Sequence, residues 1–266
     1  MEIYFDNAAT TRLGKAAAEI ADRVAREDYG NPSSLHLAGV RAEAAVRTAA
    51  EQIAKTLKAE PAELIFTSGG TESDNLAILG TARGRKGYGR HLITSAVEHP
   101  AVLEAMRFLE EQDFSVTVLP VDGAGKIALS DLEAAVRKDT ILVSLMYVNN
   151  EIGAIQPVAA AAELVHRLNP DCYFHTDAVQ AYGKFEIYPK RLGIDLLSAS
   201  SHKIAGPKGV GFLYKSRRVS LKPVSFGGGQ QGGLRSGTLN APGIAGMGEA
   251  AREAYSDFPA KRERLL

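Results

Sequence analysis

The sequence predicts an α/β fold, with a mostly parallel seven-stranded sheet covered by helices on both faces. Short runs rich in β-branched and aromatic residues alternate along the chain with helical stretches. Most of these runs are far enough apart for the crossover helix that parallel strands require. Such alternation is typical of a parallel sheet between two layers of helices. The runs expected to form strands are 64–67, 91–95, 115–119, 141–148, 173–176, 196–199 and 210–214.

The two ends of the chain depart from this alternation. Residues 14–57 have helical apolar spacing broken by a turn cluster at 29–34, which predicts two helices around a loop. The last two predicted strands are too close together for a crossover helix, so this pair is expected to be antiparallel or irregular. After a glycine-rich stretch at 227–237, residues 243–266 regain helical character, and the chain is expected to stop within a helix.

The length permits an enzyme, and the composition fits a soluble protein of a reducing cytoplasm best. The chain has 266 residues and a formal net charge of +0, so no overall field attracts nucleic acid or an anionic membrane surface. Cys172 is the only cysteine, which excludes an internal disulfide framework. The N-terminal sequence has neither the basic flank nor the apolar run of a signal peptide. No apolar run approaches the ~20 residues needed to cross a bilayer.

The sharpest local signal is the segment 67–75, Thr-Ser-Gly-Gly-Thr-Glu-Ser-Asp-Asn, between a predicted strand and a predicted helix. Glycines let the backbone approach an anion, and a helix N-terminus offers unpaired N–H groups and a positive dipole end. The Thr71 hydroxyl adds a donor. The segment therefore predicts a phosphate cradle, with a structural glycine turn as the alternative. It is neither a nucleotide P-loop nor a dinucleotide fingerprint, because the spacing differs from both.

Two charged residues that follow predicted strands are candidates for cofactor chemistry. Lys203 lies in a loop after 196–199, where a lysine of lowered pKa could form a Schiff base with a carbonyl group. The ordinary alternative is a solvated surface lysine. Asp177 follows 173–176, and a buried carboxylate there needs a cationic partner such as a protonated pyridine nitrogen. The alternative for Asp177 is a helix N-cap.

His99 and Asn150 follow two further predicted strands. His99 could stack on an aromatic ring or relay protons near neutral pH, although taken singly it is typical of a structural histidine. Asn150 would present an amide donor. Open α/β sheets bind ligands at the carboxyl ends of their parallel strands. The convergence of these residues favours a ligand site over the separate structural explanations, and no metal site is predicted.

Together these segments resemble the class V, fold-type I pyridoxal-phosphate (PLP) enzymes, and within them the cysteine desulfurases of the NifS/IscS type. The resemblance covers almost the whole chain, and the motifs occur in the family's order and spacing. It implies the large domain of a fold-type I PLP-dependent transferase. The motifs lie at 4–11, 30–34, 67–75, 98–99, 148–153, Asp177 with Gln180, 200–203, 206–211, 227–229 and 235–238.

The resemblance implies a role for each candidate residue. Lys203 would carry the cofactor as a Schiff base and act in catalysis with His99, which would also stack on the ring. Asp177 would pair with the pyridinium nitrogen, and Gln180 would contact the ring's phenolic oxygen. Asn150 would lie near the cofactor and the substrate. The residues expected to hold the phosphate are Gly70, Thr71, Ser200 and His202, with Thr238 contributed by the other subunit of a homodimer.

The resemblance also divides the chain. Residues 1–14 would form an N-terminal segment, 15–240 the PLP-binding large domain, and 241–266 the start of a helix leading to a small domain that is largely missing. In the family, that small domain carries the persulfide-forming cysteine and an arginine that grips the substrate carboxylate, and neither can be assigned here. Cys172 would lie about 15 Å from Asp177, at the other end of one strand, and is therefore expected to be a structural thiol.

The implied function is that of a cysteine desulfurase core, which converts L-cysteine to L-alanine and transfers the sulfur as a persulfide. The implied partner is a sulfur acceptor such as an iron–sulfur scaffold or a tRNA-thiolation protein, without direct nucleic-acid or membrane contact. This chain alone is expected to bind the cofactor but to form little persulfide. Two alternatives stay open: another class V aminotransferase or lyase reaction, and a non-catalytic PLP-binding scaffold. A nicotinamide-binding Rossmann protein is disfavoured by the absent fingerprint.

Overall fold

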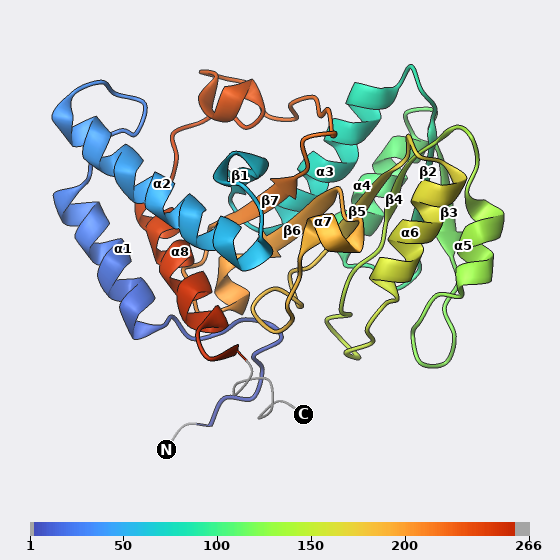
Figure 1. The fold of residues 1–266 in the computed structure, drawn as a ribbon, viewed down its shortest axis with the longest axis horizontal. Coiled ribbons are helices and arrows are strands. Elements are labelled where there is room, and N and C mark those ends of the chain that lie inside the picture. The colour runs from blue at the N-terminus through green and yellow to red at the C-terminus, as the bar shows by residue number, and fades with distance from the viewer. Residues whose placement is uncertain (1–2, 259–266) are drawn as a thin grey trace.

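The structure is a computed structural model that describes residues 3–258 and is built around one seven-stranded sheet (Figure 1). The strands are β1 Leu64–Thr67, β2 His91–Ser95, β3 Ser115–Leu119, β4 Thr140–Ser144, β5 Tyr173–Asp177, β6 Leu196–Ser200 and β7 Gly211–Lys215. Their order across the sheet is β1-β7-β6-β5-β4-β2-β3. The strands from β6 to β3 are parallel, whereas β7 runs antiparallel to both β6 and β1. The carboxyl end of β1 therefore lies at the same edge as those of the parallel strands.

Helices cover both faces of the sheet. The helices are α1 Lys15–Glu27, α2 Leu37–Leu57, α3 Gly70–Arg85, α4 Pro100–Glu110, α5 Leu129–Ala135, α6 Val158–Leu168, α7 Pro189–Leu192 and α8 Ala241–Tyr255. Successive strand residues face opposite sides, so Phe66 shares a core cluster with Met247 of α8, and Ile65 shares the other with Leu76 of α3. Figure 1 shows α1, α2 and α8 together at the β1 end of the sheet. Within residues 3–258 no helix has the length and apolar character needed to span a membrane.

The predicted fold class is confirmed, as are the two N-terminal helices and the antiparallel pair formed by β6 and β7. The predicted bounds of β1, β2 and β3 are the observed ones. β5 and β6 each extend one residue beyond the prediction, to Asp177 and Ser200, and β7 is shifted by one residue. These extensions bring two candidate site residues onto the ends of the strands themselves.

The prediction of a strand over residues 141–148 is wrong at its carboxyl end, because β4 ends at Ser144. The N–H of Tyr147 still donates to the Asp177 carbonyl on the β5 side. On the β2 side, however, the N–H of Met146 donates to the Glu98 carboxylate instead of to a strand carbonyl. A buried side chain has replaced the ladder partner, and the chain leaves the sheet to form a loop at its edge.

The helix predicted over residues 243–266 is present, but it starts two residues earlier and is interrupted after residue 255. α8 begins at Ala241, where the Asn240 side chain caps it by accepting the Gly243 N–H at 3.1 Å. It ends at Tyr255, because Ser256 has extended backbone with φ −71° and ψ 136°. The expected helical stop at residue 266 lies outside the described residues.

Candidate active site

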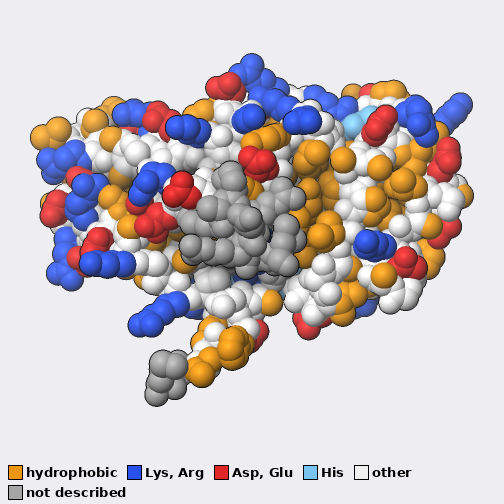
Figure 2. Space-filling model, turned by 60° about the horizontal axis from the view of Figure 1, so that its bottom comes forward, with side chains coloured by type: hydrophobic (Ala, Val, Ile, Leu, Met, Phe, Trp, Pro, Cys, Tyr) orange, Lys and Arg blue, Asp and Glu red, His pale blue; other side chains and the backbone are white. Residues whose placement is uncertain are grey.

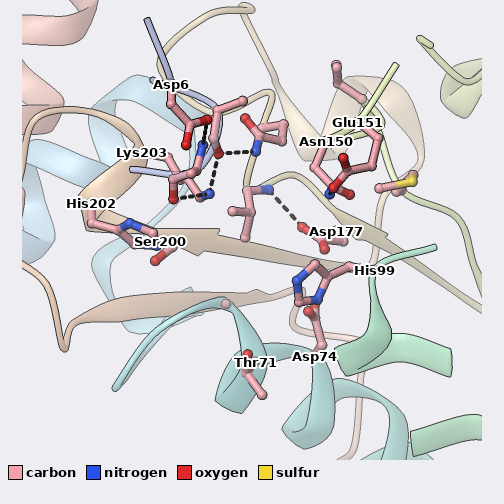
Figure 3. A pocket seen from close by; sticks show the side chains of 17 residues that line it. Asp6, Thr71, Asp74, His99, Asn150, Glu151, Asp177, Ser200, His202 and Lys203 are labelled. Carbon is pink, nitrogen blue, oxygen red and sulfur yellow. Dashed lines mark hydrogen bonds between the residues drawn. The ribbon is translucent and has the colours of Figure 1, made fainter. Parts of the chain in front are cut away.

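A cavity of about 570 Å³ opens at the edge of the sheet where the parallel strands end. Loops that follow β1, β2, β4, β5 and β6 line it together with the N-terminal segment (Figure 3). Thr238 does not line it. The predicted site residues that do are Gly70, Thr71, His99, Asn150, Asp177, Gln180, Ser200, His202 and Lys203. The fold therefore brings nine of the ten candidates to one place.

The loop from β1 into α3 has the geometry of an anion cradle. Gly69 has φ +153°, which side-chain-bearing residues rarely adopt. A Cβ on Gly211 would lie 2.7 Å from the Gly69 Cα, so β7 also begins with a glycine where the two backbones meet. The first N–H groups of α3 have no partner within the helix. Thr71 lines the cavity at this helix end, and Ser200 lines it from the end of β6. This arrangement suits a phosphate group.

A carboxylate beside the cradle is neutralised within the chain. Glu72 accepts the Arg235 Nε–H at 2.7 Å and the Ser68 N–H at 2.5 Å. Burial alone raises the pKa of Glu72, but the hydrogen bonds from Arg235 and Ser68 lower it overall. The Glu72 charge is therefore paired and does not oppose an anion in the cradle. The same ion pair ties the 235–238 motif to α3, and Thr238 of this motif does not line the cavity of its own chain.

The floor of the cavity holds buried carboxyl groups. Asp177 is 6% exposed and accepts the Val179 N–H at 2.8 Å, and burial raises its pKa. Asp74 is 1% exposed, and its Oδ1 has no hydrogen-bond partner. Burial, and then the Asp177 charge, raise the pKa of Asp74 well above its usual value. Neighbouring His175 supplies no charge, because burial lowers its pKa to about 3. A cationic group bound here would therefore favour ionised Asp177.

Buried polar side chains hold the two loops at the cavity together. The Oε1 of Glu98, just before His99, accepts the Met146 N–H at 2.9 Å. The Nδ2 of Asn149 donates to the Val97 carbonyl at 2.8 Å. These bonds join the loop after β2 to the loop after β4, and they fix the backbone on which His99 sits.

His99 and Asn150 project from these two loops. His99 caps α4, because its Nδ1 accepts the Ala101 N–H at 3.1 Å. A neutral His99 ring therefore carries its proton on Nε2. The Asn150 Nδ2 donates to Glu151 Oε1 at 2.5 Å, and both residues line the cavity. The predicted ring-stacking and substrate-contacting positions thus lie at the cavity wall.

Lys203 follows β6 and lies against the N-terminal segment at one wall of the cavity (Figure 3). Its Nζ donates to the carbonyl oxygens of Ala8 and Ala9, the latter at 2.7 Å. Burial lowers the pKa of Lys203, against the opposing effects of the Asp177 and Asp6 carboxylates. A lowered pKa is what a nucleophilic lysine requires. His202 beside it also has a lowered pKa, mainly through burial.

Sequence reasoning missed several lining residues, most clearly Asp6, Ala8, Ala9 and Asp74. The N-terminal motif was recognised without being assigned to the cavity. Thr11 brings it there, because its N–H donates to the His202 carbonyl at 2.9 Å. Asp74 lay within the recognised 67–75 segment, but only the fold reveals that its side chain faces the floor of the cavity.

Comparison with known proteins gives this site a family. The family described as aminotransferase class V matches residues 3–261, and the chain belongs to it. This family is PLP-dependent. Within it, the chain is homologous to the cysteine desulfurases of the NifS/IscS type.

Three relatives illustrate the homology. The cysteine desulfurase IscS of Dictyoglomus turgidum is 47% identical over 264 residues, which are 99% of this chain and 66% of that protein. A solved NifS-like protein superimposes with a TM-score of 0.95 at 43% identity, over 98% of this chain and 71% of the other. SspA in complex with cysteine gives 0.91 at 40% identity, over 99% and 77%. The chain thus spans about two thirds of the length of the curated relative it matches.

Proposed function

We propose that this chain is the PLP-binding large domain, residues 15–240, of a cysteine desulfurase that converts L-cysteine to L-alanine and passes on the sulfur. The observation that carries the proposal is the meeting of a lysine, a buried carboxyl group and a helix N-terminus in one cavity. Attachment of the cofactor would come from Lys203, charge pairing from Asp177, and phosphate binding from the start of α3. PLP binding requires all three.

The residues of the cavity fit PLP in both shape and chemistry. The cradle at Gly70 and Thr71, with Ser200 and His202 opposite, would hold a phosphate. No ion pair joins Asp177 to a cationic side chain among residues 3–258, and a protonated pyridine nitrogen facing Asp177 would supply a cationic partner. His99 would lie against the ring, and Gln180 would donate to the phenolic oxygen. When bound, the cofactor supplies an electron sink for a carbanion at the substrate Cα.

The protein's own groups would manage the proton and the substrate. Lys203 Nζ, the covalent attachment point, would accept the substrate Cα proton, since its pKa is lowered towards the working range. His99 Nε2–H would act as a donor on the other side of the cavity. Asn150, next to Glu151 at the wall, would contact the substrate. The relative solved with bound cysteine supports L-cysteine as the substrate class.

Sulfur transfer would need a thiol from outside this sequence. Cys172 is its only cysteine and directly precedes β5, at the opposite end from Asp177. It is fully buried, and burial raises its pKa to about 12, so it forms no thiolate near neutral pH. We therefore expect cofactor binding and Cα proton exchange, but no persulfide on Cys172. An iron–sulfur scaffold or a tRNA-thiolation protein in the cytoplasm would receive the sulfur from the complete enzyme.

A second copy of the chain would complete the site. Thr238 does not line the cavity of its own chain, as expected if it serves a partner's phosphate. Large apolar side chains are exposed on the 29–40 segment, including Leu35 at 98% and Tyr29 at 73%, and Phe226 is 71% exposed. Figure 2 also shows apolar side chains projecting at the N-terminal end, where Phe5 is 91% exposed. Surfaces of this kind are typical of interfaces.

The test is an absorption spectrum of the purified chain with added PLP, compared with that of Lys203→Ala. A visible band present only in the native chain would support covalent attachment at Lys203. Incubation with L-cysteine in deuterated water should then exchange the Cα proton, and alanine should appear only when a reactive thiol is supplied.

Two results would support other functions. Formation of an oxo-acid or pyruvate instead of alanine would favour another class V reaction. A lysine-dependent band without any exchange or product would favour a non-catalytic PLP-binding scaffold. If no lysine-dependent band forms at all, the proposed cofactor site is wrong.

A further inference from the structure

The side-chain amide of Gln180 is held from both ends. Gln180 is 7% exposed and lines the cavity. Its Nε2 donates to the Ala8 carbonyl at 2.8 Å, and its Oε1 accepts a hydrogen bond from Lys184 Nζ at 3.1 Å. A glutamine amide has two N–H donors and one carbonyl oxygen. With the oxygen held by an ammonium group, what remains for the cavity is an N–H donor.

We propose that Lys184 is a positioning residue that fixes the orientation of the Gln180 amide, so that the cavity offers a donor to an oxyanion of the bound ligand. The inference rests on the proposed function, in which that oxyanion is the phenolic oxygen of PLP. Without Lys184 the amide would keep only its bond to the Ala8 carbonyl, so it could rotate more easily and turn Oε1 towards the ligand oxygen. Two acceptors would then face each other, and a buried hydrogen bond would be lost.

The backbone on both sides of Lys184 is fixed by a single hydroxyl group. The Gly183 N–H donates to Tyr255 Oη at 3.0 Å, and the Tyr255 hydroxyl donates to the Phe185 carbonyl at 2.9 Å. Gly183 has φ +83°, and a Cβ there would lie 2.5 Å from Ile204 Cγ2. This loop therefore has little freedom. Because Tyr255 is the last residue of α8, the contacts run from the C-terminal helix to the cavity.

The placement of Lys184 is unfavourable by itself. Burial, and then the nearby Lys203 ammonium, lower its pKa. A partly buried lysine beside a second one needs a compensating contact, and the Gln180 oxygen supplies it. An unmade hydrogen bond to a buried ligand oxygen corresponds to about a 10- to 100-fold change in dissociation constant.

The test uses Lys184→Met with two probes, PLP and 3-deoxypyridoxal 5′-phosphate, which lacks only the phenolic oxygen. PLP should bind Lys184→Met about tenfold more weakly than the native chain, whereas the deoxy analogue should bind both chains equally. Equal losses for both probes would show a merely structural effect and overturn the inference, as would an unchanged affinity for PLP. Lys15→Met, on an α1 side chain that is 90% exposed, is the matched control and should change neither affinity.

Two more variants test whether Lys184 acts through Gln180. In a Gln180→Leu chain, Lys184→Met should cause no further loss of PLP affinity, and a full additional loss would contradict the inference. Tyr255→Phe should weaken the binding of PLP but not that of the deoxy analogue, and by less than Lys184→Met does. Equal effects on the two probes would show that α8 does not help to orient the Gln180 amide. If the native chain bound neither probe, the proposed function would fail, not the role of Lys184 alone.

Discussion

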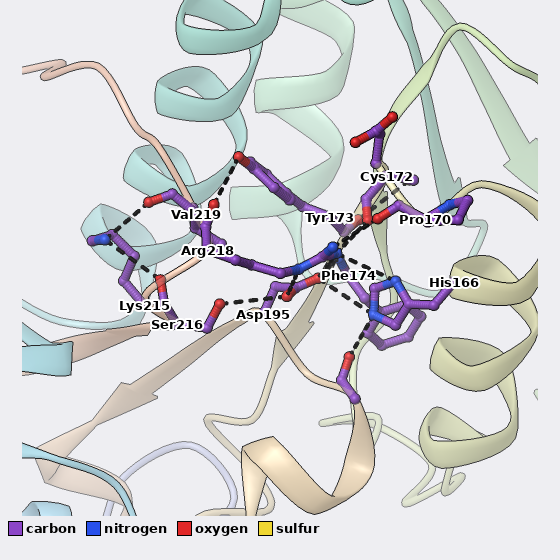
Figure 4. Close-up of polar contacts among 12 residues, drawn as sticks. His166, Pro170, Cys172, Tyr173, Phe174, Asp195, Lys215, Ser216, Arg218 and Val219 are labelled. Atoms are coloured by element: carbon purple, nitrogen blue, oxygen red, sulfur yellow. Dashed lines mark hydrogen bonds and ion pairs between the residues drawn. The ribbon is translucent and has the colours of Figure 1, made fainter.

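The two ends of strands β5 and β6 carry buried charges that are handled in opposite ways. At the amino end, Asp195 is 4% exposed and fully engaged (Figure 4). It accepts Arg218 Nε–H at 2.5 Å, Arg218 Nη2–H at 2.7 Å and the Phe174 N–H at 2.9 Å. At the carboxyl end, Asp74 and Glu98 are equally buried. Among the buried carboxyl groups of residues 3–258, these two are the ones with an oxygen that has no hydrogen-bond partner.

The difference separates a structural cluster from a ligand site. Arg218 also donates to the carbonyl oxygens of Pro170 and Cys172, both at 2.7 Å, so it joins the loop before β5 to Asp195 and β7. This cluster has nothing left to bind. At the carboxyl end, the buried carboxyl groups lack full hydrogen bonding and a cationic partner. Such groups are tolerated in a folded protein where a bound ligand or a proton compensates them. Changes at the amino end should therefore affect stability, and changes at the carboxyl end should affect binding.

The largest expected effect is that of Arg218→Met. It would leave the buried Asp195 carboxylate without its main cationic partner. The cost in the free energy of unfolding should be about 3 kcal/mol, at the low end for a broken buried pair, because the Arg218 side chain is itself 41% exposed. Denaturant unfolding followed by circular dichroism measures this. Arg217→Met, an exposed neighbour, is the control and should cost little. The folded fraction of Arg218→Met should bind PLP with native affinity, and a loss of affinity in that fraction would break the division between the two ends.

The second effect concerns Glu98, whose pKa is raised to about 8 by burial. In the unfolded chain its pKa is near the usual ~4.3, so the folded state retains a proton that the unfolded state releases. This contribution to stability is complete below the unfolded pKa and is lost as pH rises towards the folded pKa. The loss is at most about 1.4 kcal/mol per pH unit, or roughly 2–3 kcal/mol between pH 5 and 7.

Glu98→Gln should therefore flatten the dependence of unfolding free energy on pH. Its amide oxygen can still accept the Met146 N–H, so the fold at the loop should persist. Chemical denaturation at several pH values measures the slope. Glu110→Gln, an exposed residue on α4, should leave the native slope in place. A native slope in Glu98→Gln would mean that Glu98 is ionised in the folded chain.

Asp177→Asn should have a smaller energetic effect, expressed in binding. Loss of a charge-assisted hydrogen bond to the pyridine nitrogen should weaken PLP binding about 10- to 100-fold. Stability without PLP should stay equal or rise, because the change removes a buried carboxyl group whose ionisation is unfavourable. Titration of the PLP band and thermal unfolding measure the two effects. Asp171→Asn is the matched control, because Asp171 is exposed and lies just before β5. It should change neither quantity. If Asp177→Asn lowered the stability but kept native PLP affinity, the carboxyl end of the strands would have a structural role and not a binding role.

The sequence predicted what depends on local pattern and on recognised motifs. β1 to β3 were predicted to the residue from short β-rich runs. The strand after residue 140 was made too long, since an apolar run cannot reveal that Glu98 will capture the Met146 N–H. The roles of Asp74 and Lys184 could not be predicted for a related reason: the side chains near them come from distant parts of the sequence or depend on the loop conformation. Asp195 and Arg218 are 23 residues apart and meet only because β6 and β7 are antiparallel.

The smallest effect should come from Cys172→Ala. This thiol lies at the amino end of the strands, where changes should affect stability and not binding. Its sulfur is buried and donates only weakly, to the Tyr173 carbonyl at 3.5 Å, so its removal should cost about 1 kcal/mol of stability. PLP affinity and Cα proton exchange should stay native. In the native chain, an aromatic disulfide reagent should label Cys172 only after denaturation, because burial raises its pKa to about 12. Rapid labelling of the folded chain, or loss of exchange in Cys172→Ala, would place chemistry at the end of the sheet that we assign to stability.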